Sequence, residues 1–354
     1  MTFNASFRCM ISIELIMEIK PVTNNKEWRA FVCSKEPMTM LQSWNWGDFE
    51  EKQGHEVLRL GLYDNDELIG AGLYTIVRSR RAHYIVTHAG PLIDWQDAAQ
   101  FNMFHEYIRA YCKENNLDFM RFRAPLSYEE EALKPFLAMG YKKAPMYFNA
   151  EYTMVLDLTK SEDELLASMR KNTRYYVRRA EKQGVTVRIS TDPKDIDILF
   201  DVYQKTVERH HFVPYGKQFF VDEFEAFYKD DLIEILIAEK EGVALAAAFL
   251  VYYDDSAFYH HSGSVRTDPE VYAQYALQWA LITRAKERGK TRYDFWGVAP
   301  TDDPNHPRAG LTLFKRGFGG QRVRWMHTLD FPIKKWKYAL VWAFVKLERW
   351  KKRL

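Results

Sequence analysis

The chain has 354 residues, enough for two ordinary domains, and its content of 47% hydrophobic and 15% aromatic residues excludes intrinsic disorder. The net charge of +2 excludes functions that depend on a uniformly charged surface, so any contact with nucleic acid or membrane must use a local patch. The three cysteines (Cys9, Cys33 and Cys112) and the ten histidines show no metal-ligand spacing, and the cysteines form no disulfide framework, which indicates a reducing cytoplasm.

The first 16 residues, "MTFNASFRCMISIELI", contain an apolar stretch that is too short to span a bilayer, and no A-x-A-like cleavage site follows. Met17 begins "MEIKPV", which we expect to be the first strand. We therefore expect the residues before Met17 to be a dispensable extension, such as one from a misplaced start codon.

From residue 62 onward a series of segments occurs twice in the same order, with offsets of 175, 173 and 177 residues. Each series contains a β-hairpin, a short motif ending in glycine, an amphipathic helix, a short strand and a Gly-aromatic step. The pairs are 62–76 with 237–251, "THAG" (87–90) with "HHSG" (260–263), 98–116 with 272–289, 117–125 with 291–298, and 140–141 with 317–318. Matches in the same order along the chain indicate an internal duplication.

This order of elements is that of an acetyltransferase-type (GNAT-like) unit. The sequence therefore predicts an α/β protein of two tandem GNAT-like domains, with mixed sheets flanked by helices and a basic C-terminal helix. We place the domains at 17–155 and 156–322, with 323–354 packing back on the first, and we expect substrate to bind between them. The loops "AGPLIDWQDAA" and "SGSVRTDPEVYA" lack the glycine pattern that holds the pyrophosphate of acetyl-CoA, so that cofactor is not predicted.

The second unit is predicted to open with one helix that runs from the capping box "SEDE" (161–164) to Gly184. Its buried stripe is Leu166, Met169, Thr173, Val177 and Ala180. Arg170, Arg174 and Arg178 follow one another at every fourth position, either as solvated surface or as an edge that binds phosphates. Tyr175 and Tyr176 could stack on bases, but at least one is expected to pack in the core.

Residues 332–354 carry eight lysines and arginines and a single acid, with Trp336, Trp342 and Trp350 among aliphatic residues. The apolar run is far shorter than the ~20 residues that cross a bilayer. A basic, Trp-rich amphipathic helix is typical of peripheral contact with an anionic membrane surface. The alternative is a terminal helix that packs on the first domain, and both hold if only one face packs.

Six segments, "LQSWNWGDF", "AGPLIDW", "MRKNTRYYVRRAEKQGV", "TVERHHF", "YDFWGV" and "LFKRGFGG", together resemble the FemABX family of peptidoglycan cross-bridge peptidyltransferases. The resemblance covers about Leu41 to Met326. It implies transfer of an amino acid from aminoacyl-tRNA, as co-substrate without other cofactor, to the stem-peptide amine of lipid II or UDP-MurNAc-pentapeptide. The interval from Gly184 to Asp231 is too short for the helical arm of some members, so an armless member is implied.

The resemblance also implies roles for particular residues. Phe314 and Lys315 match a functional Phe-Lys pair, and a fixed ammonium would stabilise the oxyanion that forms when an amine attacks an ester. The alternative for Lys315 is an exposed lysine at a helix start. Asp94, in "GPLID", matches an aspartate proposed to deprotonate the acceptor amine, although it could instead cap the following helix or hold substrate.

Weaker implications concern binding. Arg209, Lys217 and Lys52 are implied in gripping the phosphates of the precursor, Tyr259 in lining the peptide groove, and Arg170, Arg174, Arg178 and Arg316 in binding tRNA. In the first domain the sequence has Glu50 and Glu51 before Lys52, which weakens the match for a UDP-linked acceptor. Adjacent residues on a strand have side chains that face opposite ways. The pairs His260–His261 and His210–His211 are therefore poor metal sites, and no metal is predicted.

The leading hypothesis is therefore a monomeric aminoacyltransferase, either cytoplasmic or peripheral at the cytoplasmic face of the membrane, that transfers Gly, Ala or Ser during interpeptide-bridge synthesis. One alternative is a GNAT-type N-acyltransferase that uses acyl-CoA on a sugar or peptide amine. The other is a non-catalytic protein that binds tRNA or the envelope.

Overall fold

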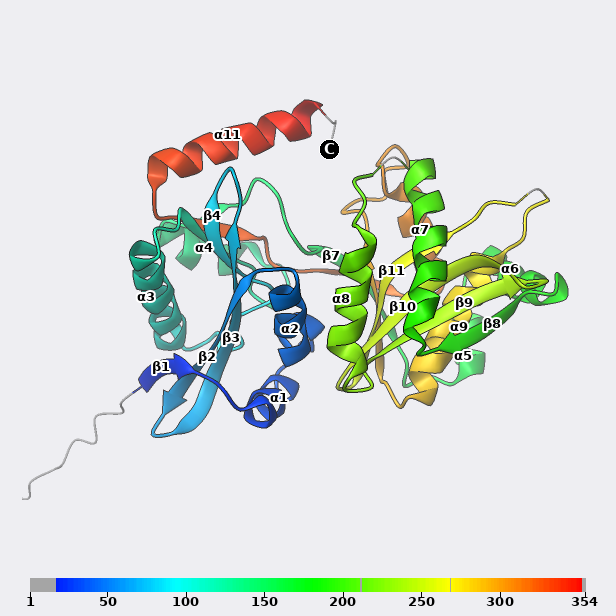
Figure 1. Cartoon of the computed structure of the whole chain (residues 1–354), viewed down its shortest axis with the longest axis horizontal. Coiled ribbons are helices and arrows are strands. Elements are labelled where there is room, and N and C mark those ends of the chain that lie inside the picture. The colour runs from blue at the N-terminus through cyan, green and yellow to red at the C-terminus, as the bar shows by residue number, and fades with distance from the viewer. Residues whose placement is uncertain (1–16, 211, 268, 352–354) are drawn as a thin grey trace, which may run out of the picture.

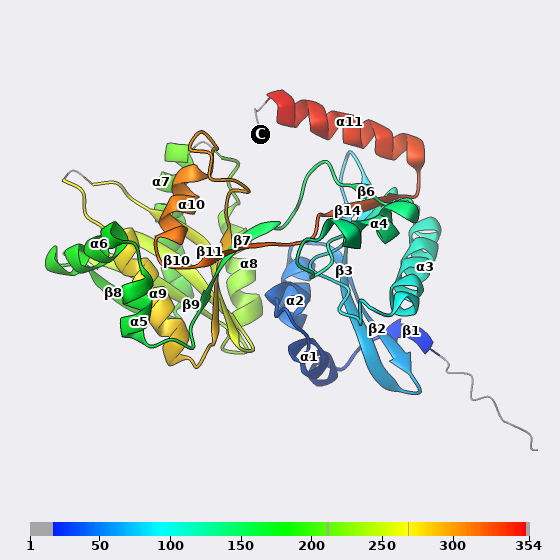
Figure 2. The same ribbon diagram turned by 180° about the vertical axis from the view of Figure 1, so that it is seen from behind.

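A computed structural model describes residues 17–210, 212–267 and 269–351, so the predicted N-terminal extension and His211 lie outside the described residues. Two domains lie side by side, and the chain crosses between them twice, once before β7 and once before β14 (Figure 1). Figure 2 shows the same two crossings from behind. Each domain is a mixed sheet flanked by helices, which confirms the predicted fold class.

The first domain is built on a sheet that has seven strands in the described residues, in the order β1-β2-β3-β4-β5-β14-β6. Its strands are β1 (Met17–Pro21), β2 (Glu56–Asp64), β3 (Glu67–Arg78), β4 (His83–Thr87), β5 (Phe119–Phe122), β6 (Lys142–Lys143) and β14 (Leu329–Pro332). Its helices are α1 (Asn25–Cys33), the short 3-10 helix η1 (Met40–Gln42), α2 (Trp44–Lys52), α3 (Ala98–Glu114), α4 (Glu130–Ala138) and α11 (Lys335–Lys351).

The second domain repeats this plan, with strand order β13-β7-β12-β11-β10-β9-β8 in the described residues. Its strands are β7 (Tyr152–Asp157), β8 (Thr186–Ser190), β9 (Ile233–Lys240), β10 (Val243–Tyr253), β11 (Ser256–Ser264), β12 (Arg292–Gly297) and β13 (Gln321–Arg324). Its helices are α5 (Glu162–Ser168), α6 (Lys171–Lys182), η2 (Pro193–Asp195), α7 (Ile196–His210), α8 (Lys217–Tyr228), α9 (Ala273–Glu287) and α10 (Ala309–Arg316). Between Gly184 and Asp231, α7 and α8 pack on the sheet.

The two crossing segments each complete a sheet. β7 pairs with β12 and β13, and β14 pairs with β5 and β6. Each of these two strands therefore lies between the edge strand of its sheet and the rest of the sheet. Arg121 on β5 and Asp330 on β14 form a buried, two-pronged ion pair at 2.6 and 2.7 Å that fixes this register. The domain boundaries predicted at 155/156 and 322/323 fall inside β7 and β13, because sequence patterns do not reveal which sheet a crossing strand joins.

The interface between the domains is apolar in its centre and polar at its edge. Helix α2 packs on α8, with the Phe49 and Phe219 rings 4.9 Å apart, and first-domain helices share one hydrophobic core with the second domain. Asn45 is buried in the interface and donates to the Ala226 carbonyl at 2.9 Å. At the exposed edge Lys52 pairs with Glu225 at 2.7 Å. The domains are therefore joined by a packed surface as well as by the two crossings.

Candidate functional site

A cavity that is partly open to solvent lies between the two domains. The first domain contributes residues that precede α2 and that follow β4 and β5, and the second contributes residues of β7, β11 and β12. The lining residues are Pro37, Met38, Thr39, Leu41, Ala89, Arg123, Pro125, Asn149, Ala150, Thr153, Phe258, Arg292, Asp294, Trp296 and Trp325. The predicted location of substrate between the two units therefore corresponds to a real cavity.

Three charged side chains line this cavity. Arg123 is buried, and the burial lowers the pKa of its guanidinium to about 10 although Glu151 and Asp294 act against the shift. Asp294 is also buried, which raises the pKa of its carboxyl, and Arg292 lies 3.5 Å away. Buried charges are costly unless they are paired or used, so these residues point to a polar ligand.

Lys315 lies beside this group, in the last turn of α10, and only 4% of it is exposed. Its ammonium donates a hydrogen bond to the Gly297 carbonyl at 2.9 Å. Burial lowers the pKa of Lys315 to about 7, against the opposing effect of Asp294. The alternative of an exposed lysine at a helix start is therefore wrong, because the side chain turns inward from the end of the helix.

An aromatic ring lies beside Lys315. The Tyr259 ring centre lies 5.5 Å from its Nζ, and the Tyr259 hydroxyl donates to Ser262 Oγ at 2.7 Å. Phe314 packs edge-on against Tyr275 and Phe318, with ring centres 5.1 and 5.3 Å apart. Phe314 therefore anchors α10 in the core, while the next residue carries the charge.

The position of α10 depends on close contact with α6. The Arg170 N–H donates to the Gly317 carbonyl at 2.9 Å. A Cβ on Gly317 would lie 2.2 Å from Thr173 Oγ1, so a glycine is required there. This contact brings the start of the basic helix α6 to the end of the helix that carries Lys315.

A sequence profile of the FemAB family matches residues 23–241 and 234–346, which is most of the chain. The chain belongs to the FemAB family. It is therefore a transferase, as the resemblance predicted. The lipid II:glycine glycyltransferase of Staphylococcus epidermidis RP62A is 21% identical, over 92% of this chain and 95% of the relative. That of Staphylococcus aureus MRSA252 is 20% identical over the same shares.

Solved structures agree on the fold. The crystal structure of FemX matches with a TM-score of 0.82 and 19% identity, over 92% of this chain and 100% of that chain. A tandem GNAT protein from the clavulanic acid biosynthesis pathway matches with a TM-score of 0.56 and 10% identity, over 89% of this chain and 98% of that chain. L-PGS from Bacillus licheniformis matches with a TM-score of 0.55 and 14% identity, over 91% of this chain and 96% of that chain.

The single helix predicted from Ser161 to Gly184 is wrong in this FemAB-family chain. Met169 and Arg170 have extended ψ angles of 147° and 144°, which separate α5 from α6, and the predicted capping box of Ser161 is present on α5. Because of the break, the Arg174 guanidinium turns back to the Leu166 and Ala167 carbonyls at 3.1 and 3.2 Å. The arginine row is therefore interrupted at its centre, with Arg170 and Arg178 exposed on either side.

The other basic residues implied in phosphate binding are engaged elsewhere. Arg209 donates to the Ser264 carbonyl at 2.8 Å, Lys217 pairs with Asp197 at 2.5 Å, and Lys52 makes the interdomain pair with Glu225. None of the three is among the described residues that line the cavity. Arg316 pairs with Asp302 at 3.0 Å on the surface beside α10.

Asp94 is exposed in the loop that leads to α3. Its carboxylate accepts a hydrogen bond from the Gln96 N–H at 2.9 Å, and its own N–H donates to Gln100. Asp97, and not Asp94, caps α3 by accepting from the Ala99 N–H. The capping alternative for Asp94 is therefore wrong, and its role as a base stays a prediction.

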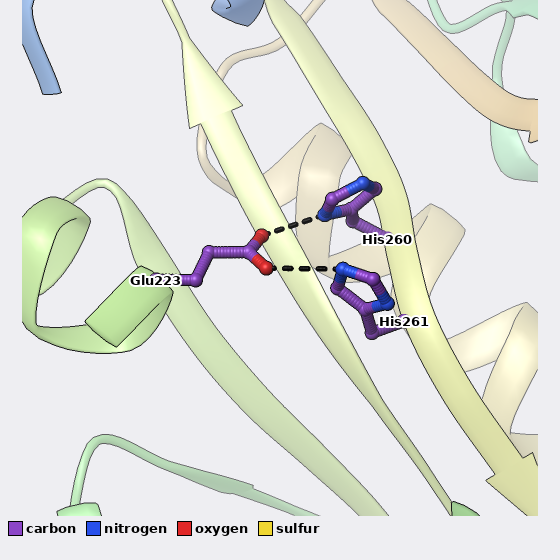
Figure 3. Close-up of side chains that lie close together, drawn as sticks. All are labelled: Glu223, His260 and His261. Carbon is purple, nitrogen blue, oxygen red and sulfur yellow. Dashed lines mark hydrogen bonds and ion pairs between the residues drawn. The ribbon is translucent and has the colours of Figure 1, made fainter. Parts of the chain in front are cut away.

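The prediction that His260 and His261 face opposite ways is also wrong. Both imidazoles lie against the carboxylate of Glu223 on α8, and their ring centres are 4.1 Å apart (Figure 3). A bulge in β11 turns the second ring to the same side. In the described residues, this is the group of His, Cys, Asp and Glu side chains whose geometry could hold a metal ion.

Sequence reasoning missed Arg123, Arg292 and Asp294. The sequence contains a pattern that could have indicated them, because "MRFRAP" and "RYDFWG" place charged residues in short strands that are otherwise apolar. Nothing in the spacing showed that the ends of these two strands meet across the domain boundary.

Proposed function

We propose that this protein transfers an amino acid of the Gly, Ala or Ser class from aminoacyl-tRNA to the stem-peptide amine of lipid II, without other cofactor, as a monomer. The observation that supports this proposal most directly is the burial of Lys315 next to charged residues of the interdomain cavity. The names of the Staphylococcus relatives support the substrate, since they are called lipid II:glycine glycyltransferases.

The proposed reaction is aminolysis of an ester. The acceptor amine forms a C–N bond to the ester carbonyl, the C–O bond to the terminal ribose breaks, and the amine proton ends on the released ribose hydroxyl. An oxyanion develops on the carbonyl, and the Lys315 ammonium is proposed to stabilise it from a site with little water. With one donor used on Gly297, two further N–H groups of the ammonium remain for the ester.

Asp94 is proposed as the base that receives the amine proton first. It is exposed, and its carboxylate accepts a hydrogen bond from the Gln96 N–H, so substrate would have to bring the amine to it. Asp94→Asn removes the basic oxygen at constant size. If the variant transfers at the wild-type rate at all pH values, Asp94 is not the base.

The tRNA is proposed to lie along α6 and the end of α10. Arg170, Arg178 and Arg316 are exposed on these two helices, which touch at Gly317, and Tyr175 is 56% exposed beside them. Tyr176 stacks on Tyr272 with ring centres 4.4 Å apart and is not available for a base. The salt dependence of tRNA affinity should therefore weaken when Arg170 and Arg178 are replaced together by alanine.

The acceptor is proposed to be lipid-linked because α11 offers a membrane-binding face. In the described residues, no helix has the length and apolar character needed to cross a bilayer. Tyr338 on α11 is buried against the first domain, and its hydroxyl donates to Asp330 at 2.9 Å. On the opposite side of the helix a stripe of apolar residues has large exposed fractions: Trp336 69%, Leu340 63% and Leu347 48%.

Lysines border this stripe, with Lys335 and Lys346 exposed, and Arg81 lies over the Phe344 ring at 4.3 Å. An apolar stripe between cations fits the interface of an anionic bilayer, at its cytoplasmic face. We expect the protein to sediment with phosphatidylglycerol vesicles and not with phosphatidylcholine vesicles. Trp336→Ser with Leu340→Ser should abolish sedimentation, whereas Val243→Ser, at a residue 60% exposed on the second domain, should not. Equal binding of both variants would refute the assignment.

The decisive experiment mixes the purified protein with a pool of charged tRNAs and either lipid II or UDP-MurNAc-pentapeptide, and weighs the products by mass spectrometry. A mass increase of one aminoacyl residue on lipid II that requires charged tRNA supports the proposal. Transfer from acyl-CoA in place of tRNA, or tRNA binding without any product, would overturn it.

A further inference from the structure

Glu223, His260 and His261 form a compact group next to the domain interface (Figure 3). Glu223 Oε1 lies 2.6 Å from His260 Nδ1, and Glu223 Oε2 lies 3.1 Å from His261 Nε2. One ligand atom from each side chain can be chosen so that all lie within 4.8 Å of one another. The second contact lacks hydrogen-bond geometry, so Oε2 and Nε2 are buried without a hydrogen-bond partner.

The backbone of β11 is distorted at this position. His260 pairs with Phe249 on β10 and Ser262 pairs with Ala248, which leaves His261 as the extra residue of a bulge. His261 has a φ of +31°, in the region that favours glycine. Without the bulge His261 would face the other side of the sheet, so the distortion is what directs both rings to one carboxylate. Such strain is typical of functional sites.

The group is buried among aromatic side chains. Glu223 is 0% exposed. Trp296 and Trp46 lie 4.9 and 6.2 Å from the His260 ring, and Phe219 lies 5.4 Å from the His261 ring. In the described residues neither lysine nor arginine forms an ion pair with this carboxylate, so the buried anion lacks a permanent countercharge.

We propose that Glu223, His260 and His261 bind a divalent transition-metal ion of the zinc class. Two imidazole nitrogens and one carboxylate oxygen are a common set of three protein ligands for such ions, with a fourth position left for water. In a tetrahedral shell with bonds of about 2.0–2.1 Å, neighbouring ligand atoms lie about 3.3 Å apart. The observed contacts of 2.6 and 3.1 Å are made by the two different oxygens of Glu223, and one ligand atom from each residue can be chosen so that all lie within 4.8 Å. Rotation of the side chains would bring two nitrogens and one oxygen to that spacing.

The ion has a structural consequence. Glu223 comes from α8, which packs on α2 of the first domain, and the histidines come from β11, next to Tyr259. A bound ion would join α8 to β11 and would fix the second-domain side of the interface. The site does not depend on the proposed substrates, so its failure and the failure of the transfer reaction are separate results.

The test uses the full chain without a histidine tag, freed of metal by a chelator and titrated with Co²⁺ and then Zn²⁺. Wild-type protein should bind about one ion per chain. Bound Co²⁺ should give the visible absorption bands of a low coordination number, and Zn²⁺ should abolish them by displacing Co²⁺. The Tm should rise on binding. His261→Gln and Glu223→Gln should lose both effects. His327→Gln is the matched control, since His327 pairs with Glu151 at 2.9 Å but lacks a third ligand.

If a variant does not fold, the wild-type spectrum alone decides. Wild-type protein that shows no Co²⁺ band and no Tm shift, or that binds as much metal after His261→Gln as before, would overturn the proposal. Retention of the Co²⁺ band in His327→Gln with its loss in His261→Gln would support it.

Discussion

The two copies of the duplicated unit differ at the helix that follows β5 in the first domain and β12 in the second. In the first copy, α4 is followed by Gly140 with a φ of +98° and by β6 from Lys142; in the second, α10 is followed by Gly319 with a φ of +93° and by β13 from Gln321. This places Lys315 opposite Phe136, and not opposite Ala138 as the Gly-aromatic step suggests. Phe136 is buried among Trp95, Phe101 and Phe122, with ring centres 5.1 to 6.1 Å away.

The same inward position is therefore apolar in one copy and cationic in the other. A buried phenylalanine stabilises the fold by removing apolar surface from water, whereas a buried lysine costs stability unless its charge is used. The first copy fills this position for stability, and the second keeps a polar group beside the interdomain cavity. A duplicated fold can thus divide structural and chemical roles between its copies at one equivalent position.

The largest effect is expected when the charge is moved into the first copy. Phe136→Lys buries an ammonium among aromatic rings without a partner, so the free energy of unfolding should fall by about 3–5 kcal/mol. Denaturant unfolding at pH 7 measures it, with Phe136→Leu as the apolar control. If Phe136→Lys lowers the free energy of unfolding no more than Phe136→Leu does, the position of Phe136 accepts a charge as readily as that of Lys315.

Removing the charge from the second copy should mainly affect catalysis. Lys315→Ala is expected to lower the transfer rate about 10²–10³-fold while the protein stays folded, because a donor aimed at the oxyanion is lost. The matched control is Lys134→Ala on α4, an exposed lysine that pairs with Glu131. Wild-type turnover in Lys315→Ala with native far-UV circular dichroism would refute the role of Lys315.

Lys315 should also make stability depend on pH. Its pKa is about 7 when folded and 10.5 ordinarily, so between these values the unfolded chain holds more protons and the wild type gains stability as pH rises. Lys315→Met lacks this gain. We expect the advantage of Lys315→Met in unfolding free energy to shrink by on the order of 1 kcal/mol per pH unit above pH 7. If the unfolding free energies of the two proteins change with pH in the same way, Lys315 is not buried with a lowered pKa.

The smallest effect is expected from the neighbouring carboxylate. The Asp294 charge raises the pKa of Lys315, so Asp294→Asn should lower that pKa and leave less ammonium at pH 7. Transfer at pH 7 should fall by less than about tenfold and recover as the pH is lowered. A loss that does not change with pH would mean that Asp294 acts on something other than Lys315.

Much of the fold was predictable because it depends on local patterns. The hairpins, the helices near 98–116 and 272–289 and the strands after them occur where apolar periodicity placed them. The break between α5 and α6 was not predictable, because the apolar stripe of Leu166, Met169, Thr173, Val177 and Ala180 continues across it. At the break the Arg170 N–H donates to the Gly317 carbonyl, a contact that spacing along the chain does not reveal. The bulge at His261 was missed for the same reason, since strand alternation carries no signal for an inserted residue.

The sequence by itself determined that the chain is duplicated, that its family is FemAB, and that Lys315 and Arg316 place two cations between Phe314 and Phe318, because these are properties of order and residue type. Only the tertiary structure decided that Lys315 is buried, that Arg123 and Asp294 line a cavity between the domains, and that β7 and β14 follow the two crossings between the domains. The physical reason is that burial and the pKa shifts it causes depend on contacts between residues far apart in the chain, and these exist only after the two domains pack.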